Sequence, residues 1–173
     1  MHEFSACHVA VADGEKKSVS DRLCNVPIVN DMEAVIGEDF FHLGGSFGIN
    51  AGVGIYVICN KERALLTAEV RHFFPDIVFN AVLGNGDAPR NKPAPDPVFA
   101  ALKNADFAIN RETVWLVGDS KQDTDCALAA GVLPVVIGNG KFMGEGELAQ
   151  YAAAGKVKCF SDFAALYRQM CRG

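Results

Sequence analysis

Short apolar runs rich in β-branched residues alternate with longer amphipathic stretches from residue 53 to the end of the chain. The short runs have the length and composition of buried strands, whereas the longer stretches place apolar residues at helical spacing. The pattern predicts strands at 54–59, 77–83, 113–117, 133–137 and 157–160, and helices at 61–74, 98–105, 121–130 and 145–154, with a last helix capped by Ser161 or Asp162. Asn60 is the expected N-cap of the first helix, and Gly131 the expected stop of the third.

This alternation predicts an α/β, Rossmann-like fold, with a three-layer parallel sheet and helices on both faces, because strand–helix–strand units form right-handed crossovers. The first 52 residues do not show this regular alternation of strand and helix patterns. Residues 9–12 and 26–29 could form strands, but five of the eleven residues from 44 to 54 are Gly, which favours a loop. We therefore divide the chain into an N-terminal segment, 1–52, and a core domain, 53–173.

Composition and net charge argue against several classes of function. The chain has 173 residues and a net charge of −5, so it lacks the basic excess with which proteins bind nucleic acid. The six cysteines form no CxxC pair, which favours free thiols in a reducing compartment. The first residues do not resemble a secretory signal, and the uncharged stretch 43–60 is too rich in Gly for a membrane span. We expect a cytoplasmic protein without a membrane segment, and leave a homodimer open.

Polar residues that follow the predicted strands are the candidate site, since ligands of such sheets bind at the carboxyl ends of the strands. Asp119 and Asp123 stand four apart at the start of a helix, where Asp119 could coordinate Mg2+ and Asp123 could support it. Three prolines stiffen the loop that carries Lys92, whose ammonium could neutralise a phosphate. The backbone N–H groups that follow Cys59 at Asn60 could bind a phosphoryl oxygen. The structural alternatives are helix-capping aspartates, a surface lysine and a core cysteine.

Three motifs in this order resemble the C-terminal half of the haloacid dehalogenase superfamily, in its phosphoglycolate-phosphatase-like branch. The motifs are Val57-Ile58-Cys59-Asn60-Lys61, Gly86-Asp87 through Lys92-Pro93-Ala94-Pro95-Asp96-Pro97, and Val117-Gly118-Asp119-Ser120 with Asp123 and Ala129-Ala130-Gly131. The resemblance implies a Mg2+-dependent phosphatase that acts on a small phosphorylated metabolite through an aspartyl-phosphate intermediate. It also implies that Asp119 is the metal ligand, Asp123 its support and Lys92 the neutralising lysine, with phosphate bound by Cys59, Asn60 and Lys92.

Two departures from the family pattern bear on catalysis. The family has Ser or Thr at the position of Cys59, and a thiol is a weaker hydrogen-bond donor than a hydroxyl. The family also opens with a strand ending in Asp-x-Asp-Gly, which supplies the nucleophile and the acid–base, and this chain has no such motif. The nearest candidates are Asp13, in a match with Val11 at the nucleophile position, and Asp31.

The same departures leave an alternative function open. The interval from Val11 to Cys59 is too short for a helical cap domain, so we expect the cap to be reduced or missing and the site to be open to water. The alternative to an active phosphatase is a catalytically inactive or truncated module that binds phosphate or a protein partner. Dehalogenation is the less favoured activity, since that branch does not need the acid that Asp119 resembles.

Overall fold

The computed structural model describes residues 8–12, 54–75, 78–138, 143, 146–162, 165, 166 and 168, with residues 8–12 described by their backbone. The strands are β1 (His8–Ala12), β2 (Gly54–Glu62), β3 (Ala81–Asn85), β4 (Val114–Gly118), β5 (Leu133–Ile137) and β6 (Lys158–Phe160). The helices are α3 (Arg63–Phe73), α4 (Asp96–Ala101), α5 (Lys121–Ala130) and α6 (Glu147–Ala153). Within these described ranges no helix is both long and apolar enough to traverse a bilayer.

The six strands form one sheet in the order β3-β2-β1-β4-β5-β6. Neighbouring pairs β2–β3, β4–β5 and β5–β6 are parallel, as predicted. Strand β1 departs from the prediction, because it runs antiparallel to both β2 and β4. The alternation of side chains in a strand reads the same in both directions, so the sequence pattern could predict that β1 forms but not its direction.

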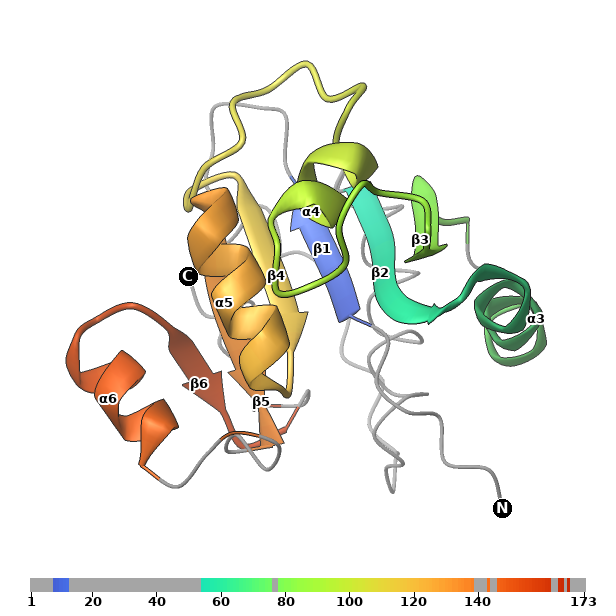
Figure 1. The fold of residues 1–173 in the computed structure, drawn as a ribbon. Helices are drawn as coiled ribbons and strands as arrows, with labels where there is room; N and C mark the ends of the chain where they lie inside the picture. The colour runs from blue at the N-terminus through green and yellow to red at the C-terminus, as the bar shows by residue number, and fades with distance from the viewer. Residues whose placement is uncertain are drawn as a thin grey trace.

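The strand order reverses at β1, which lies between β2 and β4 in the middle of the sheet (Figure 1). Strands β2 and β3 extend to one side of it, and β4, β5 and β6 extend to the other. In open α/β sheets the crevice at such a reversal, at the carboxyl ends of the parallel strands, is where ligands bind. The loops that follow β2, β3 and β4 are therefore the ones to search for a site.

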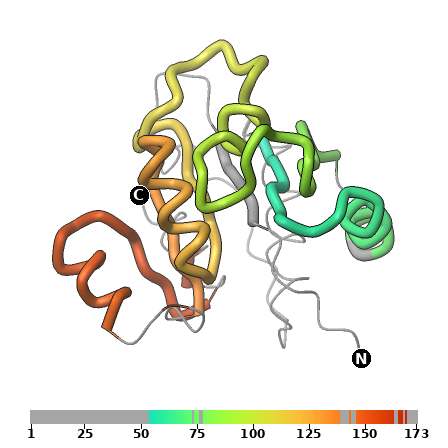
Figure 2. Tube along the Cα trace, in the orientation of Figure 1, coloured from blue at the N-terminus to red at the C-terminus, as the bar shows by residue number. Residues whose placement is uncertain are grey.

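Both faces of the sheet are buried at strands β2, β4 and β5. Helices α4 and α5 contact each other and cover one face, which is the near face in Figure 1 and Figure 2. The core under them includes Ile58 from β2, Leu116 from β4 and Ala127 from α5, each with at most 1% of its surface exposed. On the opposite face Val57 and Val117 are also buried. Burial on both sides explains the continuous apolar runs of these strands and confirms the predicted α/β class.

Three helices, α3, α4 and α6, begin at residues other than those predicted, and α6 begins at Glu147 rather than at 145. Strand β2 continues through Asn60, and α3 begins after Glu62, whose carboxylate oxygens accept hydrogen bonds from the N–H groups of Ala64 and Leu65 at 3.1 Å each. The prediction of Asn60 as the N-cap is therefore wrong, because its side chain is bonded elsewhere. Helix α4 begins at Asp96, two residues before the predicted start. Pro97 is tolerated in the first turn because the N–H that proline lacks would have no helical partner there.

Strand β3 begins four residues later than predicted, at Ala81 rather than at 77, whereas one helix and one strand have the predicted bounds. Helix α5 has the predicted bounds, and Gly131 ends it with a left-handed φ of 72°. Strand β5 also has the predicted bounds. The domain division at residue 52 stays a prediction, although β1 from the N-terminal segment lies within the sheet. The predicted strand at 26–29 and the reduced cap fall outside the described residues.

Gly84 in β3 lies against the junction of β2 and α3, where a side chain has no room. A Cβ at this position would lie 2.8 Å from the Cα atom of Arg63 and 3.0 Å from the carbonyl oxygen of Lys61. Both are backbone atoms that cannot rotate away. We expect Gly84→Ala to lower the free energy of unfolding by about 1–3 kcal/mol, measured by urea denaturation. A variant as stable as the wild type would contradict this close approach.

Candidate functional site

Lys92 lies in the loop between β3 and α4, and its ammonium points into the protein rather than into solvent. The side chain is 3% exposed. Its Nζ atom lies 2.7 Å from Oδ1 of Asp123 and donates a second hydrogen bond to the carbonyl oxygen of Ile58 at 3.2 Å. The loop therefore holds a cation at the carboxyl end of β2. This placement excludes the alternative of an ordinary surface lysine.

Asp123, in the first turn of α5, is the carboxylate that binds the Lys92 ammonium. Its Oδ2 atom accepts hydrogen bonds from the backbone N–H of Ser120, at 3.1 Å, and from the Ser120 hydroxyl. The two residues form a capping box, in which the third helical residue bonds back to the N-cap. An acidic side chain also interacts favourably with the positive end of the helix dipole. Both carboxylate oxygens of Asp123 are thus engaged, one by Lys92 and the other by the helix start.

Asp119 stands between the end of β4 and the N-cap of α5, at the same edge of the sheet. It is half-buried, whereas Asp123 is 2% exposed. The two aspartates therefore differ in their surroundings: Asp123 is enclosed and paired with Lys92, and Asp119 is more open to solvent. The structure brings Lys92, Asp119 and Asp123 to one edge, as the sequence predicts for a site.

Asn60 contributes its side-chain amide to the Lys92 loop. The Oδ1 atom accepts a hydrogen bond from the backbone N–H of Lys92 at 3.1 Å, and the Nδ2 atom donates to the backbone carbonyl of Lys92 at 2.9 Å. Nδ2 also lies 3.1 Å from Oε1 of Gln122 in α5. Cys59, the preceding residue, is a buried cysteine, 7% exposed. The role of Gln122 could not be predicted from the sequence, because a contact across 62 residues has no local signal.

Cys126 is a second residue that the sequence analysis did not place near this site. Its Sγ atom lies 3.1 Å from the carbonyl oxygen of Ala94, so the thiol links α5 to the proline-rich loop. The pKa of Cys126 is raised to about 12, mainly by burial; the charge of Lys92 acts to lower it, and the charges of Asp123 and Asp96 act to raise it. The thiol therefore stays protonated at neutral pH and acts as a donor that packs the Lys92 loop.

A polar network next to this edge joins α5 to α6. Lys121 lies 2.9 Å from Asp125 and donates to the hydroxyl of Tyr151 at 3.1 Å, while that hydroxyl donates to Asp125 at 2.7 Å. The hydrogen bonds to Asp125 and Tyr151 raise the pKa of Lys121 above its ordinary value. These contacts hold the start of α5 against α6.

The residues at this edge are compatible with Mg2+ through one carboxylate. The described residues contain no group of three or more His, Cys, Asp or Glu side chains that could hold a metal ion. Mg2+ keeps several waters, however, and is commonly held by one or two carboxylates together with phosphate oxygens of the substrate. Asp119 fits as a direct ligand. Asp123 fits as a support, because both of its oxygens already accept hydrogen bonds from Lys92 and Ser120.

The candidate nucleophiles Asp13 and Asp31 lie outside the described residues and stay predictions. The backbone of β1 shows where the chain leads before Asp13. Ala12 pairs with Val114 at the amino end of β4, and Val11 pairs with Trp115. Asp119 is four residues beyond Trp115, which corresponds to about 13 Å along a strand. Strand β1 therefore ends at the edge of the sheet opposite Asp119.

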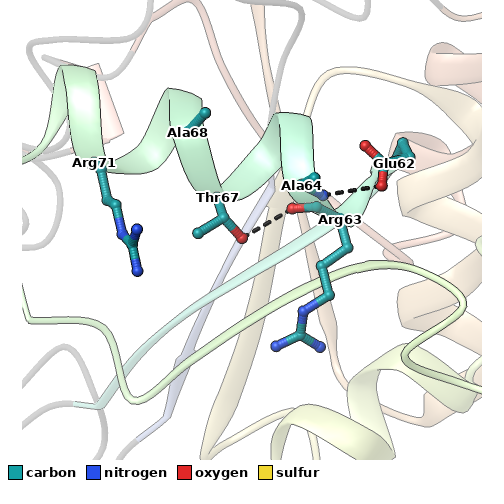
Figure 3. Close-up of a pocket in the computed structure, with 6 residues that line it drawn as sticks. All are labelled: Glu62, Arg63, Ala64, Thr67, Ala68 and Arg71. Atoms are coloured by element: carbon teal, nitrogen blue, oxygen red, sulfur yellow. Dashed lines mark hydrogen bonds between the residues drawn. The ribbon is translucent and has the colours of Figure 1, made fainter.

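An open pocket along α3 is a separate feature from this edge (Figure 3). Most of its lining side chains are exposed. Of the two arginines that line it, Arg63 is paired with Asp87. The other carboxylate oxygen of Asp87 accepts a hydrogen bond from the N–H of Gly84. The lining residues are Glu62, Arg63, Ala64, Thr67, Ala68 and Arg71. No buried polar side chain lines this pocket, so we place the candidate site at Lys92, Asp119 and Asp123.

The chain is similar to known proteins over its central part. The model of the family described as haloacid dehalogenase-like hydrolase matches residues 49–137, which include all three motifs. A provisionally named pyrophosphatase, PpaX, from Caldanaerobacter subterraneus subsp. tengcongensis is 35% identical over 86 residues, which are 50% of this chain and 38% of that protein. The phosphoglycolate phosphatase of Neisseria gonorrhoeae is 31% identical over 84 residues, 49% of this chain and 35% of that protein.

The fold is also similar to that of a solved structure. The crystal structure of a HAD-superfamily hydrolase from Ehrlichia chaffeensis matches with a TM-score of 0.62 and 23% identity, over 83% of this chain and 62% of that one. This likeness supports the fold. The matched segments span less than half the length of the two curated relatives.

Proposed function

Because the chain belongs to the haloacid dehalogenase-like hydrolases, we propose that it is a Mg2+-dependent phosphatase that acts on a small phosphorylated metabolite, in the manner of phosphoglycolate phosphatases. The observation that carries the proposal is the buried pair of Lys92 and Asp123, next to Asp119 at the carboxyl edge of the sheet. A fixed cation beside a carboxylate that can hold a metal suits a phosphoryl group, whose charge grows on oxygens during transfer. A reducing, cytoplasmic setting is part of the proposal, since the buried Cys59 and Cys126 are not joined in disulfides.

In this proposal each residue of the edge has a separate task. Lys92 holds a positive charge toward the phosphoryl oxygens, and Asp123 fixes the position of that charge. Asp119 would hold Mg2+, which when bound would neutralise phosphate charge. Cys59 and the backbone N–H of Asn60 would contact the phosphate at the end of β2, and Asp13 or Asp31 would supply the nucleophilic carboxylate. Its oxygen would attack phosphorus as the bond to the alcohol oxygen breaks, and water would then hydrolyse the aspartyl phosphate.

An assay of the purified chain with p-nitrophenyl phosphate tests the activity. We expect turnover that requires Mg2+, that EDTA abolishes, and that falls at least about tenfold in Asp119→Asn, because an amide is a poorer ligand for Mg2+ than a carboxylate. Asp106→Asn is the matched control, since Asp106 is exposed and lies away from the site. It should keep its activity within about twofold, as surface substitutions usually do. A wild-type chain that folds but does not turn over would refute the phosphatase.

A second candidate function is a module that binds phosphate or a protein partner without turnover. It is favoured by the direction of β1, whose carboxyl end lies opposite Asp119, and by the lack of an Asp-x-Asp-Gly motif in the sequence. This function keeps the cation of Lys92 but needs no nucleophile. Titration calorimetry with inorganic phosphate, in a chain without turnover, would then show binding that Lys92→Met weakens.

A further inference from the structure

The backbone of Lys92 is held by a single side chain. Asn60 accepts the N–H of Lys92 through Oδ1 at 3.1 Å and donates to its carbonyl through Nδ2 at 2.9 Å. An amide is the side chain suited to this task, because it offers an acceptor and a donor side by side. A loop residue that is bonded at both its N–H and its carbonyl has little freedom to rotate about its backbone dihedral angles φ and ψ.

The ammonium of the same residue is held by the same two elements. Asn60 and Ile58 both belong to β2, and Ile58 supplies the carbonyl that accepts from Lys92 Nζ at 3.2 Å. Asp123 and Gln122 are adjacent in α5, where Asp123 binds Nζ and Gln122 accepts from Asn60 Nδ2 at 3.1 Å. Lys92 is therefore held between β2 and α5 both at its backbone and at its side-chain ammonium.

We propose that Asn60 is a positioning residue, whose amide sets the place of the Lys92 ammonium through the Lys92 backbone and through Gln122. This inference rests on the proposed function, because it takes the Lys92 ammonium to face a phosphoryl group. It differs from a phosphate contact of the Asn60 side chain, because both polar atoms of that side chain are directed to protein partners. A misplacement of a reacting group by about 1 Å can lower a rate by as much as about a hundredfold.

The variant Asn60→Asp separates positioning from mere packing. A carboxylate has nearly the same shape and still accepts from the N–H of Lys92, but it cannot donate to the Lys92 carbonyl or to Gln122. We expect kcat/KM with p-nitrophenyl phosphate to fall by about tenfold or more, mainly through kcat. Circular dichroism checks that the variant folds. If it does not fold, Asn60→Ser removes the same hydrogen bonds without adding a charge.

A second readout does not depend on activity. The side-chain ammonium of Lys92 is buried, so we expect a 15N-detected NMR signal for it, identified by its loss in Lys92→Met. This signal should shift in Asn60→Asp or Asn60→Ser. The matched control is Asn91→Asp, which removes an exposed hydrogen bond to Asn85 in the same loop. It should leave both the Lys92 signal and the turnover within about twofold of wild type.

The two readouts distinguish the failure of this inference from the failure of the proposed function. A wild type without turnover, in which the Lys92 signal still shifts in the Asn60 variants, would refute the phosphatase and keep the positioning role. A wild type with turnover, in which Asn60→Asp and Asn60→Ser fold and change neither the signal nor kcat/KM, would overturn the positioning role. An increase in KM alone, with kcat and the Lys92 signal unchanged, would also overturn it in favour of a direct phosphate contact.

Discussion

Replacement of Lys92 by Met is expected to lower the free energy of unfolding by about 3–5 kcal/mol. The side chains of Lys92 and Asp123 are each 3% exposed, and their charged atoms lie 2.7 Å apart. Met fills a similar volume but leaves the carboxylate of Asp123 enclosed without its cation. The destabilisation therefore arises mainly from an uncompensated buried charge rather than from lost packing. Chemical denaturation in urea, followed by circular dichroism, measures it.

The ion pair of Lys61 and Glu69 provides the matched control. Its charged atoms are also 2.7 Å apart, but the two side chains are 18% and 21% exposed. Solvent screens this pair, so Lys61→Met should cost about 0–1 kcal/mol. The double variant Lys92→Met/Asp123→Leu should regain much of the stability lost in Lys92→Met, because it removes the second charge as well. Equal losses in the two single variants would contradict a buried, enclosed pair.

The second large effect is expected in the core, where Leu116→Ala should lower the free energy of unfolding by about 2–5 kcal/mol. Leu116 lies in the middle of β4, is 1% exposed and belongs to the cluster under α4 and α5. Truncation removes apolar surface from this cluster and leaves a cavity that the sheet cannot close, because its hydrogen bonds fix the strand spacing.

Leu65→Ala is the control for this core variant. Leu65 lies on α3 and is 52% exposed, so the same truncation there should change stability by less than about 1 kcal/mol. Urea denaturation of both variants beside the wild type gives the comparison. A Leu116→Ala protein as stable as Leu65→Ala would mean that α4 and α5 do not enclose this face of β4.

Helix α5 shows how much of the structure was predictable from local sequence. Its bounds follow from the helical spacing, from Ser120 at the start and from Gly131 at the end, all of which are properties of neighbouring residues. The start of α3 was not predictable in the same way. Asn60 has the residue type of an N-cap, but Lys92, 32 residues away, takes both polar atoms of its side chain, and Glu62 caps the helix instead.

The position of the candidate site could be predicted from the sequence, but the contacts within it could not. The order of strands and loops placed Lys92, Asp119 and Asp123 at carboxyl ends, and a parallel sheet brings such ends to one edge. The sequence did not distinguish the two aspartates by their surroundings. Asp123 is enclosed because Lys92 and Ser120 satisfy both of its oxygens, and this depends on how the β3–α4 loop packs against α5.

The sequence by itself determined the alternation of strands and helices, the family, and the residues that can carry charge at the site, because these depend on local periodicity and on short motifs. Only the tertiary structure decided the direction of β1, the burial of the Lys92–Asp123 pair and the bonding of Asn60 to Lys92 and Gln122. These features join segments that are far apart in the chain. Their geometry is set by packing and by the satisfaction of buried polar groups, which no local pattern encodes.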